Sequence, residues 1–527
     1  MAGIGFTLKR LFRDETYTNR GKAYIYSALV SAGPWIAAVV TVNIMLATME
    51  VFLDNPLEKE LFMGTIVYSF VFSQIITAPW QFIITRYISD KLYTEEYDCI
   101  RPSYIGINKI VFFLSFIIAV CFYINKPISI YYKVMSIYLF TILTMVWILM
   151  VYLSAVKNYE LISKAYIYGG LISIGMTIFF LLNPIKFPSN VYSTNILFAY
   201  LLGISLTFAI LLYSFLSTFY FGNNLEYDFI RYVNKFPSLF YIGLFYTVGL
   251  WIDDIIMWFS VVGVNAYETY HYAPIYDNAV FLAYLTTIPS TVMFLVSVET
   301  EFYDCYKKYY ELANKTGTYE ELLIAKNEMK KTLYGKLRHT FYVQLLITTT
   351  IILLSRQILS FLNISIVIRN IFRISALGAV FNIFALLIII VLLYFESRVY
   401  AVIVSFIFLA SNIIFTYLFS SSGLEYYGYG FTIGSFISLI IAMIFLSRFI
   451  KKLNFTTFSL QPLFVEEDTG IFIKISDTMN RYKLNEVNQG NNLLKNKLKI
   501  NSKYINILII LAAIFIYFIA KIISIKF

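Results

Sequence analysis

Charged residues are scarce in this sequence, and their scarcity excludes a soluble protein. Asp, Glu, Lys and Arg make up 14% of the 527 residues, whereas a typical soluble domain carries about 25%. Hydrophobic residues make up 59%. Apolar segments of about 20 residues, the length that crosses a bilayer as a helix, recur along most of the chain. We therefore predict an all-α polytopic membrane protein and not a soluble domain with one anchor.

Patterns for metal binding and catalysis are also missing. The three cysteines lie far apart and the two histidines stand alone, so we expect no metal site. The chain has no Gly-rich phosphate loop, no His-Glu-x-x-His and no nucleophile elbow. We therefore expect no cofactor and no catalytic residues, which favours a transporter over an enzyme.

The net charge of +10 could indicate binding to nucleic acid, but basic loops on the cytoplasmic side of a bilayer explain it better. The N-terminal segment and the long connection 299–341 are rich in Lys and Arg, whereas 263–277 has neither. We therefore predict a cytoplasmic N-terminus and no nucleic acid partner. Arg356, Arg369 and Arg373 are exceptions to this bias.

Twelve spans are predicted, and they are grouped into lobes. Their ranges are 23–49, 61–86, 105–124, 131–154, 164–182, 193–221, 237–262, 278–298, 342–362, 373–395, 399–420 and 429–450. We assign 1–222, with a basic amphipathic start, and 223–455 to two six-helix lobes. Residues 456–504 are a polar, weakly structured cytoplasmic linker, and 505–527 form an extra hydrophobic helix.

An internal repeat relates the lobes. Gly-x-Trp-Ile occurs at Gly33 in span one and at Gly249 in span seven, 216 positions later. A Thr-x-Pro element ends at Pro79 in span two and at Pro289 in span eight, 210 positions later. An even number of spans in each unit gives both copies the same orientation, so the substrate path is expected between them.

Asp253 and Asp254 are the clearest polar feature, because they lie inside the apolar span seven. An ionised Asp at the bilayer centre costs about 2.5–3.5 kcal/mol, so the pair must face the protein interior. It either lines the path for substrate or coupling ions, or only holds helices together. The equivalent residues of span one are Ala37 and Ala38, so the charge belongs to one lobe.

Two further groups are candidates. Trp35, Tyr246 and Trp251 fall on the first span of each lobe and could stack on sugar rings, or only pack. Four charged residues end spans two and eight and could gate the cytoplasmic mouth, or only reach the interface: Arg86, Asp90, Glu299 and Glu301.

The sequence resembles the Pel exopolysaccharide transporter (PelG) family over about residues 1–455. The resemblance is carried by Met1–Phe6, Ser31–Trp35, Thr85–Tyr93, Gly249–Asp253, Tyr276–Leu285, Val298–Tyr303 and Phe372–Gly378. It implies a place in the polysaccharide-flippase (MOP) superfamily and a V-shaped pair of lobes in a bacterial plasma membrane. It also implies an N-acetylgalactosamine-rich polymer as substrate. The implied partners are a cytoplasmic glycosyltransferase and other membrane subunits of a synthase complex.

We therefore expect a transporter that exports an amino-sugar exopolysaccharide through a cavity between two lobes. The sequence leaves open whether the path alternates its access or is held open and fed by a synthase. One rival is a flippase for a lipid-linked oligosaccharide, and another is a cation-coupled multidrug antiporter. A membrane glycosyltransferase or polymerase is disfavoured, because the outer loops are too short to hold a reaction.

Overall fold

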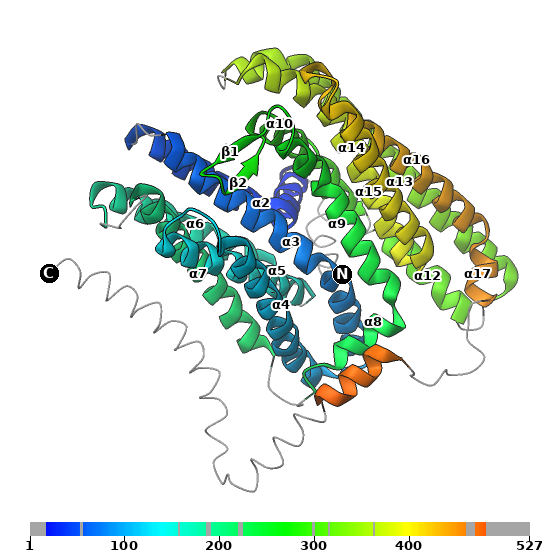
Figure 1. The fold of residues 1–527 in the computed structure, drawn as a ribbon. Helices are drawn as coiled ribbons and strands as arrows, with labels where there is room; N and C mark the ends of the chain where they lie inside the picture. The colour runs from blue at the N-terminus through cyan, green and yellow to red at the C-terminus, as the bar shows by residue number, and fades with distance from the viewer. Residues whose placement is uncertain are drawn as a thin grey trace, which may run out of the picture.

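The structure is a computed structural model in which helices form nearly all of the regular structure (Figure 1). It describes residues 17–52, 56–155, 159–185, 191–219, 225–297, 301–314, 317–361, 364–459 and 470–480. The predicted basic segment at the start of the chain and the predicted extra helix 505–527 lie outside these residues. The lobe boundary at 222–223 does too.

The helices follow one another with short connections. In chain order they are α2 (Tyr17–Phe52), α3 (Pro56–Tyr93), α4 (Ile100–Tyr123), α5 (Ile130–Ala155), α6 (Tyr159–Leu182), α7 (Val191–Thr218), α8 (Arg231–Lys235), α9 (Pro237–Trp258), α10 (Pro274–Leu285), α11 (Ile288–Ser297), α12 (Tyr303–Asn314), α13 (Tyr319–Phe361), α14 (Ile366–Tyr394), α15 (Arg398–Ser420), α16 (Tyr429–Lys451) and α17 (Leu453–Ser459). Within the described ranges, 3₁₀ turns lie between helices at Tyr97–Cys99, Asp228–Ile230 and Leu424–Tyr426.

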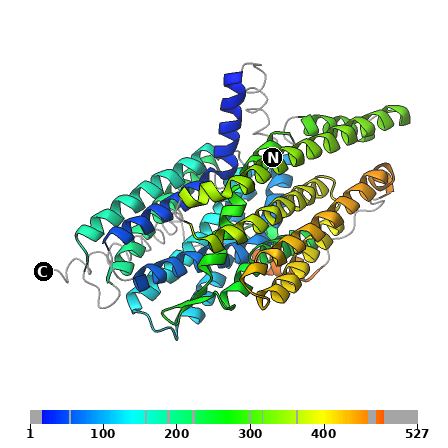
Figure 2. The ribbon, with the colours of Figure 1, turned by 90° about the horizontal axis from the view of Figure 1, so that it is seen from above.

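Twelve helical stretches in the described part of the chain are long and apolar enough to cross a membrane. This confirms the predicted polytopic architecture. Span nine differs from its prediction, because α13 begins at Tyr319 and not near residue 342. Its 43 residues correspond to about 65 Å of helix, roughly twice the hydrocarbon thickness. The connection expected at 299–341 is therefore largely helical, and Figure 2 shows α12 and α13 extending away from the bundle.

Helix packing follows the same pattern in both halves, as an internal repeat predicts. In the first half α2 packs on α6, α6 on α7, and α3 on α5; in the second half α9 packs on α15, α15 on α16, and α10 on α14. These pairs involve spans 1·5, 5·6 and 2·4, and then 7·11, 11·12 and 8·10. Figure 1 shows α4 to α7 on one side of the molecule and α13 to α16 on the other, with α3 and α9 between them.

Each half also places one helix against the other half. The helix α3 packs along α9, and α11 packs against α2, so span two meets span seven and span eight meets span one. The first contact is close, since a Cβ atom on Gly243 would stand 2.3 Å from the Ala78 carbonyl oxygen. The two halves therefore meet through reciprocal, symmetry-related pairs of helices.

Span eight is not the single helix predicted at 278–298. It consists of α10 and α11, which are separated at Thr286 and Thr287. Pro289 has no N–H to donate and its ring clashes with a preceding carbonyl, so a continuous helix is disfavoured there. In span two, by contrast, α3 runs through Pro79 without interruption.

The connection after span seven forms a small β-hairpin, in which β1 (Val264–Ala266) pairs antiparallel with β2 (Tyr270–Tyr272). Its Tyr270 is fully buried against the first half, where the hydroxyl is 3.0 Å from Thr65 Oγ1 and 2.8 Å from the Tyr123 hydroxyl. The Tyr68 ring of α3 stacks on Trp258 at 4.9 Å. The hairpin therefore joins the two halves at this end of the bundle.

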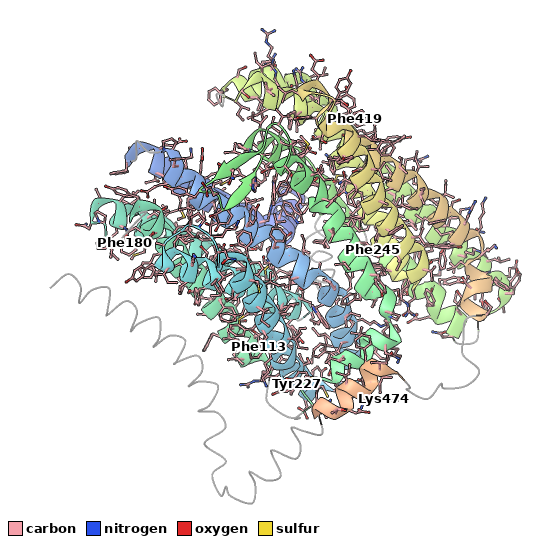
Figure 3. All side chains as sticks on the ribbon, viewed as in Figure 1. Phe113, Phe180, Tyr227, Phe245, Phe419 and Lys474 are labelled. Atoms are coloured by element: carbon pink, nitrogen blue, oxygen red, sulfur yellow. The ribbon has the colours of Figure 1, made fainter. Side chains whose placement is uncertain are left out.

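The segment predicted as a weakly structured linker contains a helix at residues 471–480. Figure 3 shows this helix, labelled at Lys474, near Tyr227 in the connection between the halves. Asn480 Oδ1 accepts a hydrogen bond from the Tyr227 N–H at 3.1 Å, and Arg231 pairs with Asp477. The prediction was wrong here because Ile473 and Ser476 are buried against the bundle, which stabilises the helix.

Candidate functional site

A buried polar network surrounds the two predicted carboxylates of α9. Asp253 is fully buried and Asp254 is 5% exposed. The Tyr276 hydroxyl of α10 donates to Asp253 Oδ2 at 2.9 Å, and Asn412 Nδ2 of α15 donates to Asp253 Oδ1 at 3.0 Å. Thr416 in turn donates to Asn412 Oδ1 at 2.9 Å. Neutral donors from two neighbouring helices therefore hold Asp253 inside the second half.

Asp254 has a different partner, which the sequence reading missed. Its carboxyl group lies next to that of Asp277 in the first turn of α10, close enough for a hydrogen bond between the two. Such a bond forms only when one of the two carboxyl groups holds a proton. The other oxygen of Asp254, Oδ1, is buried and has no hydrogen-bond partner among the described residues. The pair is therefore a place where a proton can be held inside the membrane span.

The Asp277 carboxylate is held by donors at the N-terminus of α10 and at the end of α9. Its carboxylate accepts from the Trp258 indole N–H and from the Ala273 N–H, each at 3.2 Å, which satisfies one of the free N–H groups that begin α10. Through the Trp258 indole, Asp277 therefore ties the start of α10 to the end of α9. No group of three His, Cys, Asp or Glu side chains in the described ranges could hold a metal ion.

A small pocket reaches this network from the end where α15 joins α16. It is lined by Tyr276 and Thr416 together with residues 419–430 of that connection. Its volume of about 10 Å³ corresponds to room for about one water molecule. Water could therefore approach the buried carboxyl groups from this end of the bundle.

Two of the three predicted aromatic residues, Trp35 and Trp251, lie where the two halves meet. The third, Tyr246, lies inside the second half. The Trp251 indole of α9 donates to Gln74 Oε1 of α3 at 3.0 Å. The Trp35 ring of α2 lies 5.5 Å from the Phe281 ring of α10. Each motif tryptophan therefore contacts the opposite half.

Tyr246 belongs to a second polar cluster, two helical turns from Asp253 along α9. Its hydroxyl donates to Asn382 Oδ1 of α14 at 3.0 Å, and the Tyr284 hydroxyl of α10 donates to the same oxygen at 3.3 Å. Asn382 is fully buried. Asn382, Asn412 and Asp277 were missed by the sequence reading, although polar residues inside apolar spans are the signal that could have identified them.

Of the four residues predicted at the mouth, Arg86, Asp90 and Glu301 lie in the described part of the chain, where they belong to two separate ionic groups. Arg86 pairs with Asp90 at 3.1 Å within α3 and with Glu396 at 2.6 Å in the connection from α14 to α15. Glu301 pairs with Lys336 of α13 at 2.6 Å, and Glu299 lies outside the described residues. The Arg86–Glu396 pair therefore joins the two halves, whereas Glu301 is bound within its own half.

Aromatic side chains, among them a half-buried tyrosine, surround the Arg86 pair. The guanidinium of Arg86 lies 5.1 Å from the Phe236 ring centre, and that of Arg398 lies 4.4 Å from it. Tyr232 of α8 is hydrogen-bonded to Asp90, and burial together with this carboxylate raises the pKa of the tyrosine above its ordinary value. The contact between halves at this end is thus ionic and partly exposed, unlike the buried tyrosines at the hairpin end.

Solved structures with a similar fold are transporters. An outward-facing multidrug resistance MATE family transporter of the MOP superfamily aligns with a TM-score of 0.57 at 12% identity, over 82% of this chain and 97% of the other. A MOP superfamily transporter from Pyrococcus furiosus, described as having a binding pocket of reverse polarity, aligns with a TM-score of 0.54 at 14% identity, over 82% and 96%. At such identities the likeness shows the fold alone. A comparison with curated protein sequences gives no match.

The twelve spans of the described residues and the paired halves give a multi-pass membrane protein with the same fold as transporters of the MOP superfamily. Residues 1–458 match the PelG family, which is described as an exopolysaccharide exporter (EPS-E). The chain belongs to this family. The 471–480 helix lies beyond the matched part.

Proposed function

We propose that this protein exports an amino-sugar exopolysaccharide across a bacterial plasma membrane, along a path between its two halves. The observation that carries the proposal is the family match over residues 1–458 on a transporter fold. The path is bordered by α2, α3, α9 and the two parts of span eight, which are the helices that each half places against the other.

The buried carboxyl groups support a coupled step in this export. A proton held between Asp254 and Asp277 can exchange with water that enters the neighbouring pocket. Asp253 can offer acceptors to sugar hydroxyl and amide groups. An antiporter that moves another substrate would use the same proton site, so the nature of the substrate is tested separately.

The decisive experiment measures secreted polymer in the native host. Deletion of the gene should remove the extracellular polysaccharide while the sugar nucleotide precursor accumulates, and the full chain should restore secretion. Digestion of the polymer with glycosidases of known linkage then identifies the sugar. Secretion of unchanged polymer by the deletion strain would overturn the proposal.

The proposed orientation places the N-terminus and α12 in the cytoplasm and the hairpin outside. Thiol labelling of intact cells tests it at Val261, which is 93% exposed, and at the exposed Lys330. Tyr270, in the middle of the same outer loop, is fully buried and would not report its side. A cysteine at Val261 should react with an impermeant maleimide and one at Lys330 should not, whereas the opposite result would reverse the topology.

The cytoplasmic partners are a further part of the proposal. The helical extension formed by α12 and the first turns of α13 carries exposed charged residues and projects from the bundle (Figure 2). A cytoplasmic glycosyltransferase docked there would deliver the growing chain to the path. Co-purification with the synthase should be lost when the extension is shortened, while insertion of the spans is kept.

A flippase for a lipid-linked oligosaccharide is a second candidate, which three arginines of α13 and α14 favour. Arg373 Nε donates to Ser355 Oγ at 2.7 Å. Arg369 Nε is buried without a hydrogen-bond partner in the part of the chain that the structure describes, and Arg356 is exposed. Guanidinium groups suit phosphate. Purified protein that moves a lipid-linked sugar across vesicles without a synthase would favour this candidate.

A further inference from the structure

The interruption of span eight lies in the middle of a 24-residue span. A break inside a membrane helix frees backbone groups that have no water to bind. Some of these backbone groups find partners locally. The N–H groups of Thr286 and Thr287 donate to carbonyls three residues earlier, at 3.1 and 3.0 Å. Pro289, in the first turn of α11, has no N–H to satisfy.

On the other side of the break, the N–H groups of Ser290 and Thr291 donate to the Thr287 carbonyl at 3.1 and 3.3 Å, and one side chain from span nine adds further hydrogen bonds. Gln344 of α13 is fully buried. Its Nε2 donates to the Thr286 carbonyl at 2.7 Å, and its Oε1 accepts from the Ser290 N–H at 3.1 Å. The second Nε2 hydrogen is directed to Thr348 Oγ1 at 2.9 Å. The amide therefore bridges the Thr286 carbonyl and the Ser290 N–H, the two groups that would bond directly to each other in a continuous helix.

The two sides of the break are held by different parts of the molecule. The helix α10 packs along α14, and its Tyr284 is hydrogen-bonded to Asn382, so it belongs to the body of the second half. The helix α11 packs mainly against α13 and against α2 of the first half, and its contact with α14 is much smaller than that of α10. A change in the angle between α10 and α11 would therefore move the contact between the halves without disturbing the carboxyl network.

We infer that the break is a hinge on which α11 moves relative to α10, and that Gln344 is the positioning residue that holds one of its arrangements. The inference rests on the proposed transport function, in which the two halves change their fit. Because Gln344 and the local turns supply the hydrogen bonds, the break is stable without a bound substrate. In this it differs from broken helices whose free backbone groups bind substrate or ions.

Distances between spin labels on the full-length chain in lipid nanodiscs test the hinge. One label pair, at Asn278 and Leu295, reports α10 against α11. A reference pair, at Asn278 and Asn370, reports α10 against α14. Both are measured in a background in which Cys99, Cys121 and Cys305 are replaced by serine.

Three variants separate the hinge from a general loss of packing. Gln344→Met keeps the length of the side chain but removes the hydrogen bonds to the Thr286 carbonyl and the Ser290 N–H. It should shift the 278–295 distances to a second population, while the 278–370 distances stay unchanged. Gln344→Glu keeps the acceptor for Ser290 and should restore much of the original distribution. Thr348→Val removes only the neighbouring hydroxyl and should leave both distances as they are.

Other outcomes overturn the inference. These are an unchanged 278–295 distance in Gln344→Met, an equal shift in Thr348→Val, or parallel broadening of both label pairs. The readout needs no substrate, so it is independent of the polymer secretion that tests the proposed function. A hinge that responds to Gln344 in a protein that secretes no polysaccharide would leave the inference standing and remove the proposed substrate.

Discussion

Gly33 of α2 and Gly249 of α9 occupy equivalent places in the two halves, and each packs against the corresponding neighbour. A Cβ atom on Gly33 would stand 2.9 Å from Ser163 Oγ of α6, and one on Gly249 would stand 2.8 Å from the Phe408 ring of α15. Two residues later, Trp35 and Trp251 reach across to the opposite half. The duplicated motif therefore builds the scaffold and the contact between the halves.

Beyond this motif the halves diverge. Span one continues with Ala37 and Ala38, where span seven has two buried carboxyl groups. Span two runs through its proline, where span eight breaks. The buried carboxyl pair and the interrupted helix thus lie in the second half, whereas the equivalent positions of the first half are alanines and an unbroken helix. One copy of the repeat therefore has only packing residues where the other has ionisable ones.

The largest effect is expected when the second half is made to match the first. The double change Asp253→Ala and Asp254→Ala recreates the span-one sequence and should lower polymer export by about tenfold or more, equal to roughly 1.4 kcal/mol. Asp253→Asn with Asp254→Asn keeps hydrogen bonding but removes the charge. Export should fail in both variants if the charge drives coupling, and should be retained largely in the Asn variant if the pair binds sugar.

Membrane levels of both variants, measured by quantitative blotting, serve as the control. A loss of protein that accounts for the loss of export would show that the carboxyl groups only stabilise the second half. Normal export by the double Ala variant would remove them from the mechanism.

The motif glycines should differ in their tolerance of a methyl group. Gly249→Ala places Cβ against a ring and 3.2 Å from the Leu409 Cα atom, so overpacking should cost about 1–3 kcal/mol. Gly33→Ala meets only the Ser163 side chain, with Oγ at 2.9 Å and Cβ at 3.4 Å, and the better helix propensity of Ala, worth up to about 1 kcal/mol, offsets part of the contact. Thermal unfolding in detergent measures both, and equal destabilisation would contradict the difference.

The two tryptophans should differ by one hydrogen bond. Trp251→Phe keeps a ring but loses the bond to Gln74, which should cost about 0.5–1.5 kcal/mol. Trp35→Phe should lower the free energy of unfolding by less, because Trp35 contacts Phe281 ring to ring and a phenylalanine keeps that contact. Adding Gln74→Leu to Trp251→Phe checks the cause by thermal unfolding. A double variant that loses the full sum of the two single effects would show that the bond contributes nothing.

The smallest effect concerns ion pairs that are partly exposed. Arg86→Gln breaks a pair between the halves, and Lys336→Gln breaks one within the second half. Each should change the free energy of unfolding by roughly 0.2–1 kcal/mol. Only Arg86→Gln should increase thiol labelling of a cysteine at Phe236, which lies beneath the Arg86 guanidinium. Equal labelling in both variants would mean that the Arg86 pair does not close this end.

The sequence predicted the positions of the membrane spans well, because apolar length is a strong signal. It also located Asp253 and Asp254, since carboxylates in an apolar run are conspicuous. It missed Asp277, which the predicted range of span eight left at the edge of a loop. It placed Arg86 at the cytoplasmic mouth but did not identify Glu396 as the partner of Arg86. The two residues are 310 positions apart, and no local pattern connects residues at that separation.

The twelve spans, the repeat and the presence of two carboxylates in only one copy of its motif were determined by the sequence alone, because hydrophobic length and motif spacing are properties of the chain itself. Only the tertiary structure decided that span eight is interrupted while span two is not, although both contain the same Thr-x-Pro element. The physical reason is a partner from elsewhere in the chain: Gln344 of span nine offers the hydrogen bonds that make an interruption tolerable inside the membrane.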